Sequence, residues 1–278
     1  MTVTESQAWC AAIMRAHAKS FYFSTRLLPQ AKREAVEALY GLFRTADDLA
    51  DEPGLSSAQR RDGLAAIKSD LALLDQAETG SEAPWFAAVH RAFARFPIDI
   101  HDALRLVQGC ESDLNTPHIH TLEDLERYSA AVAGTVGRTS MPILGAADAD
   151  SLERGERLGI AMQLTNVVRD VEEDAQFGRD YLPRLSYPDA TTGEIMRIIA
   201  LRARELYSEA LVLASRVPND GSRAALLMTA DIYGGILDRL ERNGFDPARG
   251  RVFVPLHEKL WRGLRCFAIA HVGRATIK

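Results

Sequence analysis

The sequence predicts an all-α fold. Apolar residues recur at spacings of three and four along nearly the whole chain, and prolines and glycines fall between the periodic segments. No stretch alternates polar and apolar residues with the β-branched enrichment that is typical of strands. The chain also lacks a low-complexity tract or a fixed-period repeat, so we expect one helical domain over residues 1–278.

The periodic segments define the expected helices in order. Thr121 with Asp124, and Thr191 with Glu194, have the spacing of capping boxes and mark two of the helix starts. Pro29, Pro97, Pro183, Pro188, Pro218 and Pro247 lie between segments. The expected ranges are 4–19, 30–51, 56–78, 83–95, 99–114, 122–146, 150–176, 192–215, 220–243 and 254–271.

Composition excludes several classes of protein. A net charge of −5 disfavours nucleic-acid binding, which usually needs a basic face. Three widely spaced cysteines do not form a disulfide framework and fit a reducing compartment. The sequence has no signal peptide and no apolar run of the roughly 20 residues that span a bilayer, so we expect a cytoplasmic protein.

The C-terminal segment differs in charge from the rest of the chain. Between Arg251 and Lys278 there are six Lys or Arg residues and one acid, with Trp261 and Phe267 among them. Such a basic segment suits peripheral contact with the inner face of a membrane, or an anionic ligand, and a solvated helix face remains the third interpretation.

Two acidic stripes, far apart in the sequence, are the main functional signal. In the first, the apolar stripe of Val36, Leu39, Tyr40 and Phe43 continues onto Asp47 and Asp51, with Arg44 beside them, so we expect these acids to face the interior. The second stripe borders an apolar helix face and consists of Gln163, Asn166, Asp170 and Asp174, with Arg169 nearby.

A carboxylate that faces an interior is costly unless it is hydrogen-bonded, paired or bound to a metal. Magnesium is commonly held by one or two carboxylates together with substrate phosphates. Two facing acid pairs, with Arg44, Arg169 and Lys19 near them, are therefore expected to hold a diphosphate through metal ions and direct hydrogen bonds. The substrate would gain from losing diphosphate, as an allylic prenyl chain does.

Other segments are ambiguous by themselves. Lys19 and Ser20, at the end of the first helix, suit either phosphate oxygens or the helix dipole. The small-residue run after Tyr128, with Gly134 and Gly137, indicates either close helix packing or room for a bulky apolar ligand. Tyr233 lies on an apolar helix, which by itself predicts a core residue. A loop beyond the second acidic stripe carries Arg179 and Tyr181 and is placed to close over a bound anion.

The segments HAKSF, RTADDLADE, YSAAVAGTVG, QLTNVVRDVEED, GRDYLP and RVFVP make the chain resemble the squalene/phytoene synthase family over nearly its whole length. The resemblance implies the isoprenoid synthase fold, with an apolar cavity between two Asp-rich helices. It implies Mg²⁺, or Mn²⁺ in its place, on Asp47, Asp51, Asn166, Asp170 and Asp174, with Arg44, Arg169 and Tyr128 also catalytic. The implied substrate-binding residues are His17, Lys19, Ser20, Tyr40, Gln163, Tyr233, Arg251 and Lys259.

This resemblance implies head-to-head condensation of two prenyl diphosphates through a cyclopropylcarbinyl diphosphate. The compact length and the RVFVPLHEKLW ending look most like bacterial phytoene or dehydrosqualene synthases, and we expect 15-cis-phytoene from two geranylgeranyl diphosphates. C15 substrates, which would give presqualene diphosphate, dehydrosqualene or squalene, are the alternative, and NADPH is needed only for squalene.

Two rival classes of protein give different expectations. Di-iron oxidases need Glu-x-x-His pairs on two helices, and no histidine here has Glu three positions before it. A non-catalytic partner that only binds prenyl diphosphate remains the alternative, and complete acid pairs with nearby bases argue against it.

Overall fold

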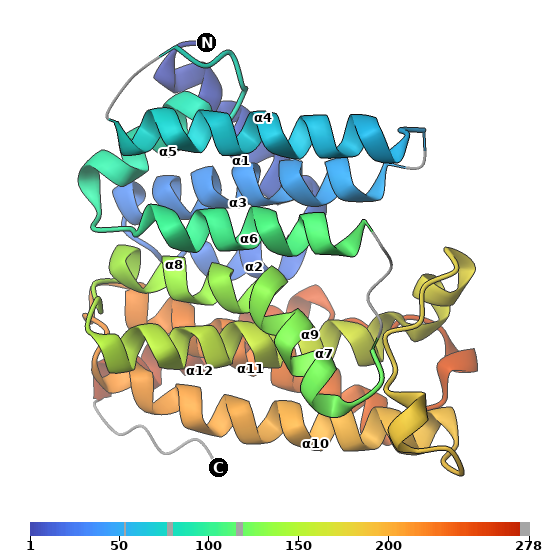
Figure 1. Cartoon of the computed structure of the whole chain (residues 1–278). Helices are drawn as coiled ribbons and strands as arrows, with labels where there is room; N and C mark the ends of the chain where they lie inside the picture. The colour runs from blue at the N-terminus through green and yellow to red at the C-terminus, as the bar shows by residue number, and fades with distance from the viewer. Residues whose placement is uncertain (53, 77–79, 115–118, 273–278) are drawn as a thin grey trace.

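The computed structural model describes residues 1–52, 54–76, 80–114 and 119–272, and these residues contain no β-strand (Figure 1). An all-α fold is therefore confirmed. The α-helices are α1 Val3–His17, α2 Lys19–Thr25, α3 Gln30–Asp51, α4 Ser57–Asp75, α5 Phe86–Arg95, α6 Ile100–Asp113, α7 Leu122–Ser129, α8 Thr135–Leu144, α9 Ala149–Gln176, α10 Thr192–Leu211, α11 Ser222–Arg242 and α12 Leu256–Val272. Both expected capping boxes are present. The hydroxyl oxygens of Thr121 and Thr191 accept the backbone N–H groups of Asp124 and Glu194, and the carboxylates of Asp124 and Glu194 accept the backbone N–H groups of the two threonines.

Three expected helices are interrupted or altered. The helix expected over 4–19 ends at His17, because Ala18 leaves helical geometry (φ −117°, ψ 51°), and the separate helix α2 follows. The helix expected over 122–146 contains a π-helical turn, η1 Ala130–Gly134, between α7 and α8. The helix expected over 192–215 finishes as a 3₁₀ turn, Val212–Ser215. The expected end of the helix over 56–78, and Arg274 and Lys278 of the basic segment, lie outside the described residues.

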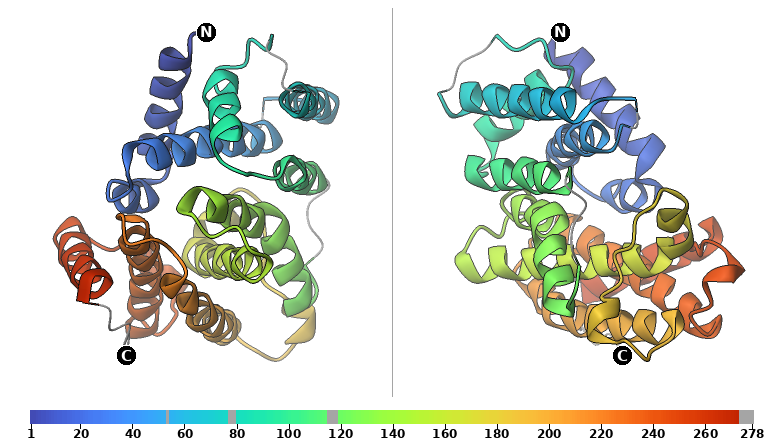
Figure 2. Two further views of the ribbon diagram at one scale, coloured as in Figure 1. Left: turned by 90° about the vertical axis from the view of Figure 1, so that its left-hand side faces the viewer. Right: turned by 45° about the vertical axis from the view of Figure 1, so that its right-hand side comes forward.

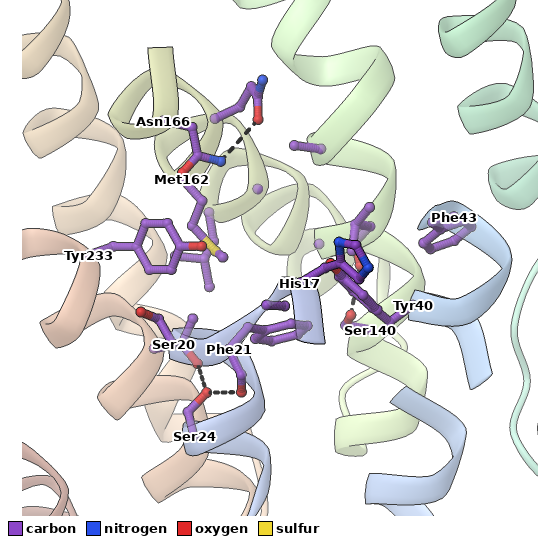
Figure 3. Close-up of a pocket in the computed structure, with 18 of the residues that line it drawn as sticks. His17, Ser20, Phe21, Ser24, Tyr40, Phe43, Ser140, Met162, Asn166 and Tyr233 are labelled. Atoms are coloured by element: carbon purple, nitrogen blue, oxygen red, sulfur yellow. Dashed lines mark hydrogen bonds between the residues drawn. The ribbon is translucent and has the colours of Figure 1, made fainter. Parts of the chain in front are cut away.

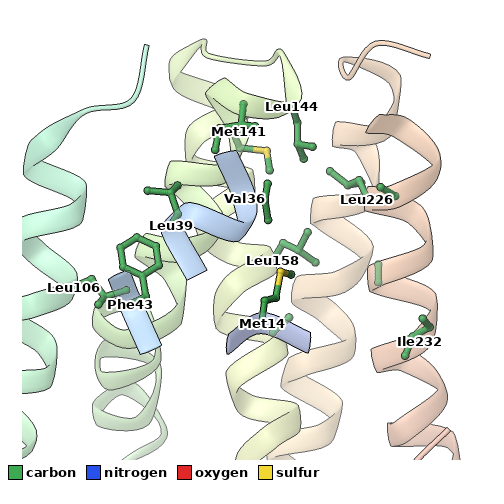
Figure 4. Packing of buried hydrophobic residues seen from close by; sticks show 14 of the residues in the cluster. Met14, Val36, Leu39, Phe43, Leu106, Met141, Leu144, Leu158, Leu226 and Ile232 are labelled. Carbon is green, nitrogen blue, oxygen red and sulfur yellow. The ribbon is translucent and has the colours of Figure 1, made fainter. Parts of the chain in front are cut away.

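Helices α3 and α9 organise two halves of the molecule (Figures 1 and 2). Helix α3 packs against α1, α4, α5 and α6, whereas α9 packs against α8, α10 and α11, and α8 contacts both α3 and α9. Buried side chains of α3 and α8, among them Val36, Leu39 and Met141, form part of one hydrophobic core (Figure 4). Helix α12 lies at the edge of the bundle, beside α11 (Figure 2).

The small-residue run brings two backbones into contact. A Cβ atom at Gly137 would lie 2.0 Å from the carbonyl oxygen of Gly155 on α9, and one at Gly159 would lie 2.1 Å from the carbonyl oxygen of Ala133. Such separations exclude any side chain. Close helix packing therefore accounts for Gly137 and fixes η1 and α8 against α9. The second interpretation, room for an apolar ligand, applies as well, because Ala133, Val136 and Gly137 also line the cavity described below.

Candidate active site

A cavity of about 910 Å³ lies between the two halves of the bundle. Its walls come from the end of α1, from α2, α3, η1, α8, α9 and α11, and from the segment 251–259 (Figure 3). Most of the site residues expected from the sequence line it: His17, Lys19, Ser20, Tyr40, Arg44, Asp47, Tyr128, Gln163, Asn166, Arg169, Asp170, Tyr233, Arg251 and Lys259. Asp51 and Asp174, one helical turn beyond Asp47 and Asp170, do not line it.

The acids of α3 are less enclosed than their place in the apolar stripe predicted. The side chains of Asp47 and Asp51 are 53% and 43% exposed. Both acids lie in the last turns of α3, where the apolar stripe reaches the end of the helix. Asp47 nevertheless faces the cavity, where Arg44 Nη1 lies 3.2 Å from its Oδ2 atom. The other terminal nitrogen of Arg44 pairs with Asp48 at 2.5 Å.

Two of the four carboxyl groups have strongly raised pKa values. The surrounding protein removes part of the hydration of Asp47, and together with the negative charge of Asp51 this raises its pKa to about 6, although half of the side chain is exposed. Burial, reinforced by Asp170, does the same for Asp174, whose pKa is also about 6. Each pair thus consists of acids that repel one another at neutral pH, which is the electrostatic setting that a bound cation relieves.

Asp170 is the most enclosed carboxylate of the second stripe, with 15% of its side chain exposed. Arg169 Nε donates to its Oδ1 atom at 2.8 Å, and Arg251 Nε approaches the same oxygen at 2.9 Å. Arg251 also pairs with Glu173 at 2.8 Å. Segment 251–255 is thereby fastened to α9 beside the cavity.

Asn166 carries an unsatisfied oxygen atom. Its amide nitrogen donates to Oε1 of Gln163 at 3.2 Å, which leaves the amide oxygen buried and without a hydrogen-bond partner in the described part of the chain (Figure 3). A buried polar atom normally has a partner. This oxygen lies on the cavity wall one turn before Asp170, where it suits a cation.

These oxygen donors therefore fit magnesium. Carboxylate oxygens lie on both helices, the pKa values of Asp47 and Asp174 are raised, and the amide oxygen of Asn166 lacks a hydrogen-bond partner in the described part of the chain. Among the described residues, however, no three His, Cys, Asp or Glu side chains converge closely enough to hold a metal by themselves. Such a site needs further oxygen ligands, and phosphate oxygens of a substrate are the usual ones for magnesium.

Arg179, which the sequence places on a loop beside the acids, is not among the predicted site residues. Its two terminal nitrogens donate to the two carboxylate oxygens of Asp51 at 2.9 and 2.6 Å. Two residues later, the ring of Tyr181 stacks on that of Tyr128, with 5.2 Å between ring centroids. The loop is thus attached to α3 and to the cavity wall. In the sequence, the position of Arg179 in the motif GRDYLP, directly after the second acidic stripe, is the feature that indicates a role at the site.

Two lysines give the cavity a positive region. Burial and the nearby positive charge of Lys19 lower the pKa of Lys259. Neither lysine has an ion-pair partner within the described ranges, and both line the cavity. Two such cations close together suit an anionic ligand.

Tyr40 and Tyr233 are kept neutral. Burial raises the pKa of Tyr40 to about 12 and also raises that of Tyr233. Both rings point toward the cavity (Figure 3) and therefore present O–H groups that can donate to an oxygen of a ligand. The expectation that Tyr233 is an ordinary core residue is incomplete, because its side chain forms part of the cavity wall.

The rest of the wall is mainly apolar. Phe21, Phe43, Val136, Met162 and Leu226 come from five different helices and surround the space beyond the charged groups. The cavity therefore has an ionic region that can hold phosphate oxygens and, next to it, an apolar region suited to hydrocarbon chains.

Comparison with known proteins gives a consistent result. The family model for squalene/phytoene synthase matches residues 14–258. The chain is 32% identical to a phytoene synthase of Arthrospira platensis, over 98% of this chain and 94% of that one. It is 33% identical to a 15-cis-phytoene synthase of Synechococcus elongatus, over 99% and 95%.

Solved structures agree on the fold. A dehydrosqualene synthase crystal structure superposes with a TM-score of 0.85 at 27% identity, covering 97% of this chain and 98% of that one. The squalene synthase HpnC of Alicyclobacillus acidocaldarius gives 0.78 at 26% identity, covering 88% and 96%. The helical arrangement is that of the isoprenoid synthases, and the chain belongs to the squalene/phytoene synthase family of prenyltransferases.

Proposed function

We propose that this enzyme condenses two molecules of geranylgeranyl diphosphate head to head, giving 15-cis-phytoene and two diphosphates. The observation that carries the proposal is the composition of the 910 Å³ cavity. Acidic and basic side chains line one part of it, and apolar side chains line the adjoining part. The choice of C20 substrates is supported by relatives named phytoene synthases that match nearly the whole chain.

In the proposed reaction, the first prenyl diphosphate loses its diphosphate and becomes an allylic cation. The double bond of the second substrate attacks this cation, and loss of a proton closes a cyclopropane ring. The resulting cyclopropylcarbinyl diphosphate loses the second diphosphate, rearranges and releases another proton to give the hydrocarbon.

Asp47, Asp51, Asn166, Asp170 and Asp174 would hold Mg²⁺, with Mn²⁺ as a substitute. When bound, the metal supplies positive charge that stabilises a departing diphosphate. The oxygen donors occur on both α3 and α9, and the orphaned amide oxygen of Asn166 is the observation in the structure that supports this ligand set.

The cationic side chains bind the diphosphate oxygens directly. Arg44 and Arg169 are placed beside the two acidic stripes, and Lys19 with Lys259 supplies a second positive region. Arg251, His17, Ser20 and Gln163 line the same cavity, as do the phenols of Tyr40 and Tyr233. Donors fixed before the reaction stabilise charge as it develops on the leaving group without further reorganisation.

The apolar wall protects the carbocations from water. Tyr128 adds an aromatic face, which is favourable to a nearby cation, and Tyr181 holds that ring by stacking against it. Tyr128 is accordingly proposed to act on the carbocation and not on the diphosphate.

A C15 substrate is the second candidate, because a dehydrosqualene synthase structure covers almost all of this chain. Presqualene diphosphate, dehydrosqualene or squalene would then form, and NADPH would be needed for squalene alone. The deciding experiment incubates the enzyme with C15 and C20 diphosphates, with Mg²⁺ or EDTA and with or without NADPH, and identifies the hydrocarbon by mass spectrometry. Phytoene from the C20 substrate is the expected product. No Mg²⁺-dependent diphosphate release from either substrate would instead indicate a prenyl-diphosphate-binding partner without activity.

We also propose that the whole chain forms one catalytic domain in the cytoplasm, with peripheral contact at the inner face of the membrane. No helix in the described ranges is both long and apolar enough to span a bilayer.

A further inference from the structure

The outward face of α12 is unusually apolar. Large side chains that are 47–71% exposed follow one another here: Phe253, Leu256, Leu260, Trp261, Leu264 and Phe267. At 100° per residue, Leu256, Leu260, Leu264 and Phe267 share one stripe, and Trp261 borders it. We call these six side chains the α12 apolar face. A contiguous exposed patch of this kind marks an interaction surface.

The charged side chains of the same helix form ion pairs within the protein. Glu258 pairs with Arg239 of α11 and with Arg262, and Arg262 Nη1 lies 3.1 Å from Oδ1 of Asp231. Arg265 pairs with Asp231 as well. Arg262 and Arg265 therefore give no support to membrane contact through basic residues, because acids of the protein already pair with them.

The α12 apolar face is continuous with the cavity. Phe253 is 71% exposed and also lines the cavity, so it stands at the rim. Lys259, one residue before Leu260, lines the cavity from the other side of the helix. Only α11 packs extensively against α12 among the described helices, and the outer side of α12 is uncovered (Figure 2).

We infer that the α12 apolar face docks this enzyme on the surface of a lipid bilayer, with the rim at Phe253 turned toward the lipid. This inference rests on the proposed function. A hydrocarbon product has no polar group and leaves the cavity favourably only into an apolar phase. An amphipathic helix with aromatic and leucine side chains on one face is the kind that lies in the interfacial region of a bilayer.

A second copy of the chain fits this surface less well. Stable protein interfaces use about 20–30 residues from each partner. The α12 apolar face has six large side chains, five on one helix and Phe253 three residues before its start. Interfacial lipid, in contrast, needs only a narrow apolar stripe.

Flotation of the full chain with phosphatidylcholine vesicles tests the inference. The wild type is expected to float, at about 0.1 M and about 1 M salt alike, because apolar insertion is little screened by ions. Leu264→Glu should lower the membrane partition constant about tenfold or more, as expected for losing the burial of one leucine side chain. Leu201→Glu is the matched control: Leu201 is 57% exposed on α10, and this variant should float like the wild type.

Turnover of detergent-dispersed substrate separates docking from catalysis. Leu264→Glu should keep wild-type turnover in detergent, since Leu264 does not line the cavity. Wild-type protein that stays unbound, or Leu264→Glu protein that floats normally, would overturn the inference. Flotation that requires anionic lipid and disappears at high salt would overturn it too, as would a change from dimer to monomer in Leu264→Glu with flotation unchanged. If the wild type consumes no prenyl diphosphate in detergent, the proposed function fails while the flotation result stands separately.

Discussion

Arg179 and Asp51 are 128 positions apart, yet they form a two-point ion pair with N–O distances of 2.9 and 2.6 Å. The pair ties the loop after α9 to the C-terminal turn of α3. The charge of Arg179 also partly offsets the raised pKa values of Asp47 and Asp174, which burial and neighbouring carboxylates cause. One guanidinium group therefore lies near acids of both helices.

The first prediction concerns this arginine. In Arg179→Gln, Asp51 no longer has a competing cation, so Mn²⁺ should bind the substrate-free protein more tightly, as measured by electron paramagnetic resonance. Turnover should nevertheless fall about tenfold or more, because a cation close to the diphosphate site is lost. Arg184→Gln removes an arginine of the same loop that pairs with Asp180, and it should change neither quantity. Weaker Mn²⁺ binding in Arg179→Gln would contradict the competition.

The acids themselves give the second prediction. Asp47→Asn and Asp170→Asn should each lower turnover about a hundredfold or more, since several kcal/mol of charge stabilisation depends on metal ligands. Circular dichroism should show an unchanged helix content. Asp48→Asn is the matched control, because Asp48 pairs with Arg44 and does not line the cavity. Equal losses in Asp48→Asn and Asp47→Asn would refute the assignment of Asp47.

The raised pKa of Asp47 predicts how stability depends on pH in the absence of metal. The folded protein binds this proton more tightly than the unfolded chain does, since the pKa moves from 3.8 to about 6. The group therefore favours folding at low pH and loses that contribution as pH rises through about 6.

The melting temperature measured in EDTA tests this dependence. Relative to the wild type, Asp47→Asn should melt higher at about pH 7.5, and the difference should shrink toward about pH 5, where the wild-type carboxyl group is protonated. A variant that is less stable than the wild type at the higher pH would show that the carboxylate is satisfied without metal.

The contact between α8 and α9 supplies a prediction about stability. Gly137→Ala places a methyl group 2.0 Å from the carbonyl oxygen of Gly155, and the backbones must separate. We expect a loss of about 1–3 kcal/mol in the free energy of unfolding, as for other overpacked sites. Gly234→Ala in α11 meets nothing within 4 Å and should be neutral or stabilising. Urea denaturation of both variants would reveal whether the close contact is real.

Much of this architecture follows from local sequence patterns. Helix α3 has the bounds that its periodicity predicts, and the spacing of Asn166 and Asp170 places both on one wall of the cavity. Helical periodicity specifies which side chains share a face, so it can predict such groupings.

Other features depend on contacts between distant segments. Nothing near Arg251 in the sequence indicates that it pairs with Asp170, 81 positions earlier. Periodicity also says nothing about where the packed part of a helix ends, so it places Asp47 on the inward stripe without indicating that half of its side chain is exposed. The sequence likewise does not indicate that Arg262 and Arg265 form ion pairs with Asp231, because Asp231 lies on another helix.

The π-helical turn η1 has a consequence for tolerance to insertion and deletion. Thr135 donates its N–H to the carbonyl of Ala130, five residues back, so this turn holds one residue more than a regular α-helical turn. If the same residues took regular α-helical pitch with none deleted, α7 would turn by about 100° relative to α8. Deleting one residue from 130–134 would instead restore regular pitch and leave the rotation between α7 and α8 nearly unchanged. Tyr128 would leave its stacking partner only in the first case, so the aromatic lining of the cavity depends on the wide turn of 130–134 and tolerates the loss of one residue there.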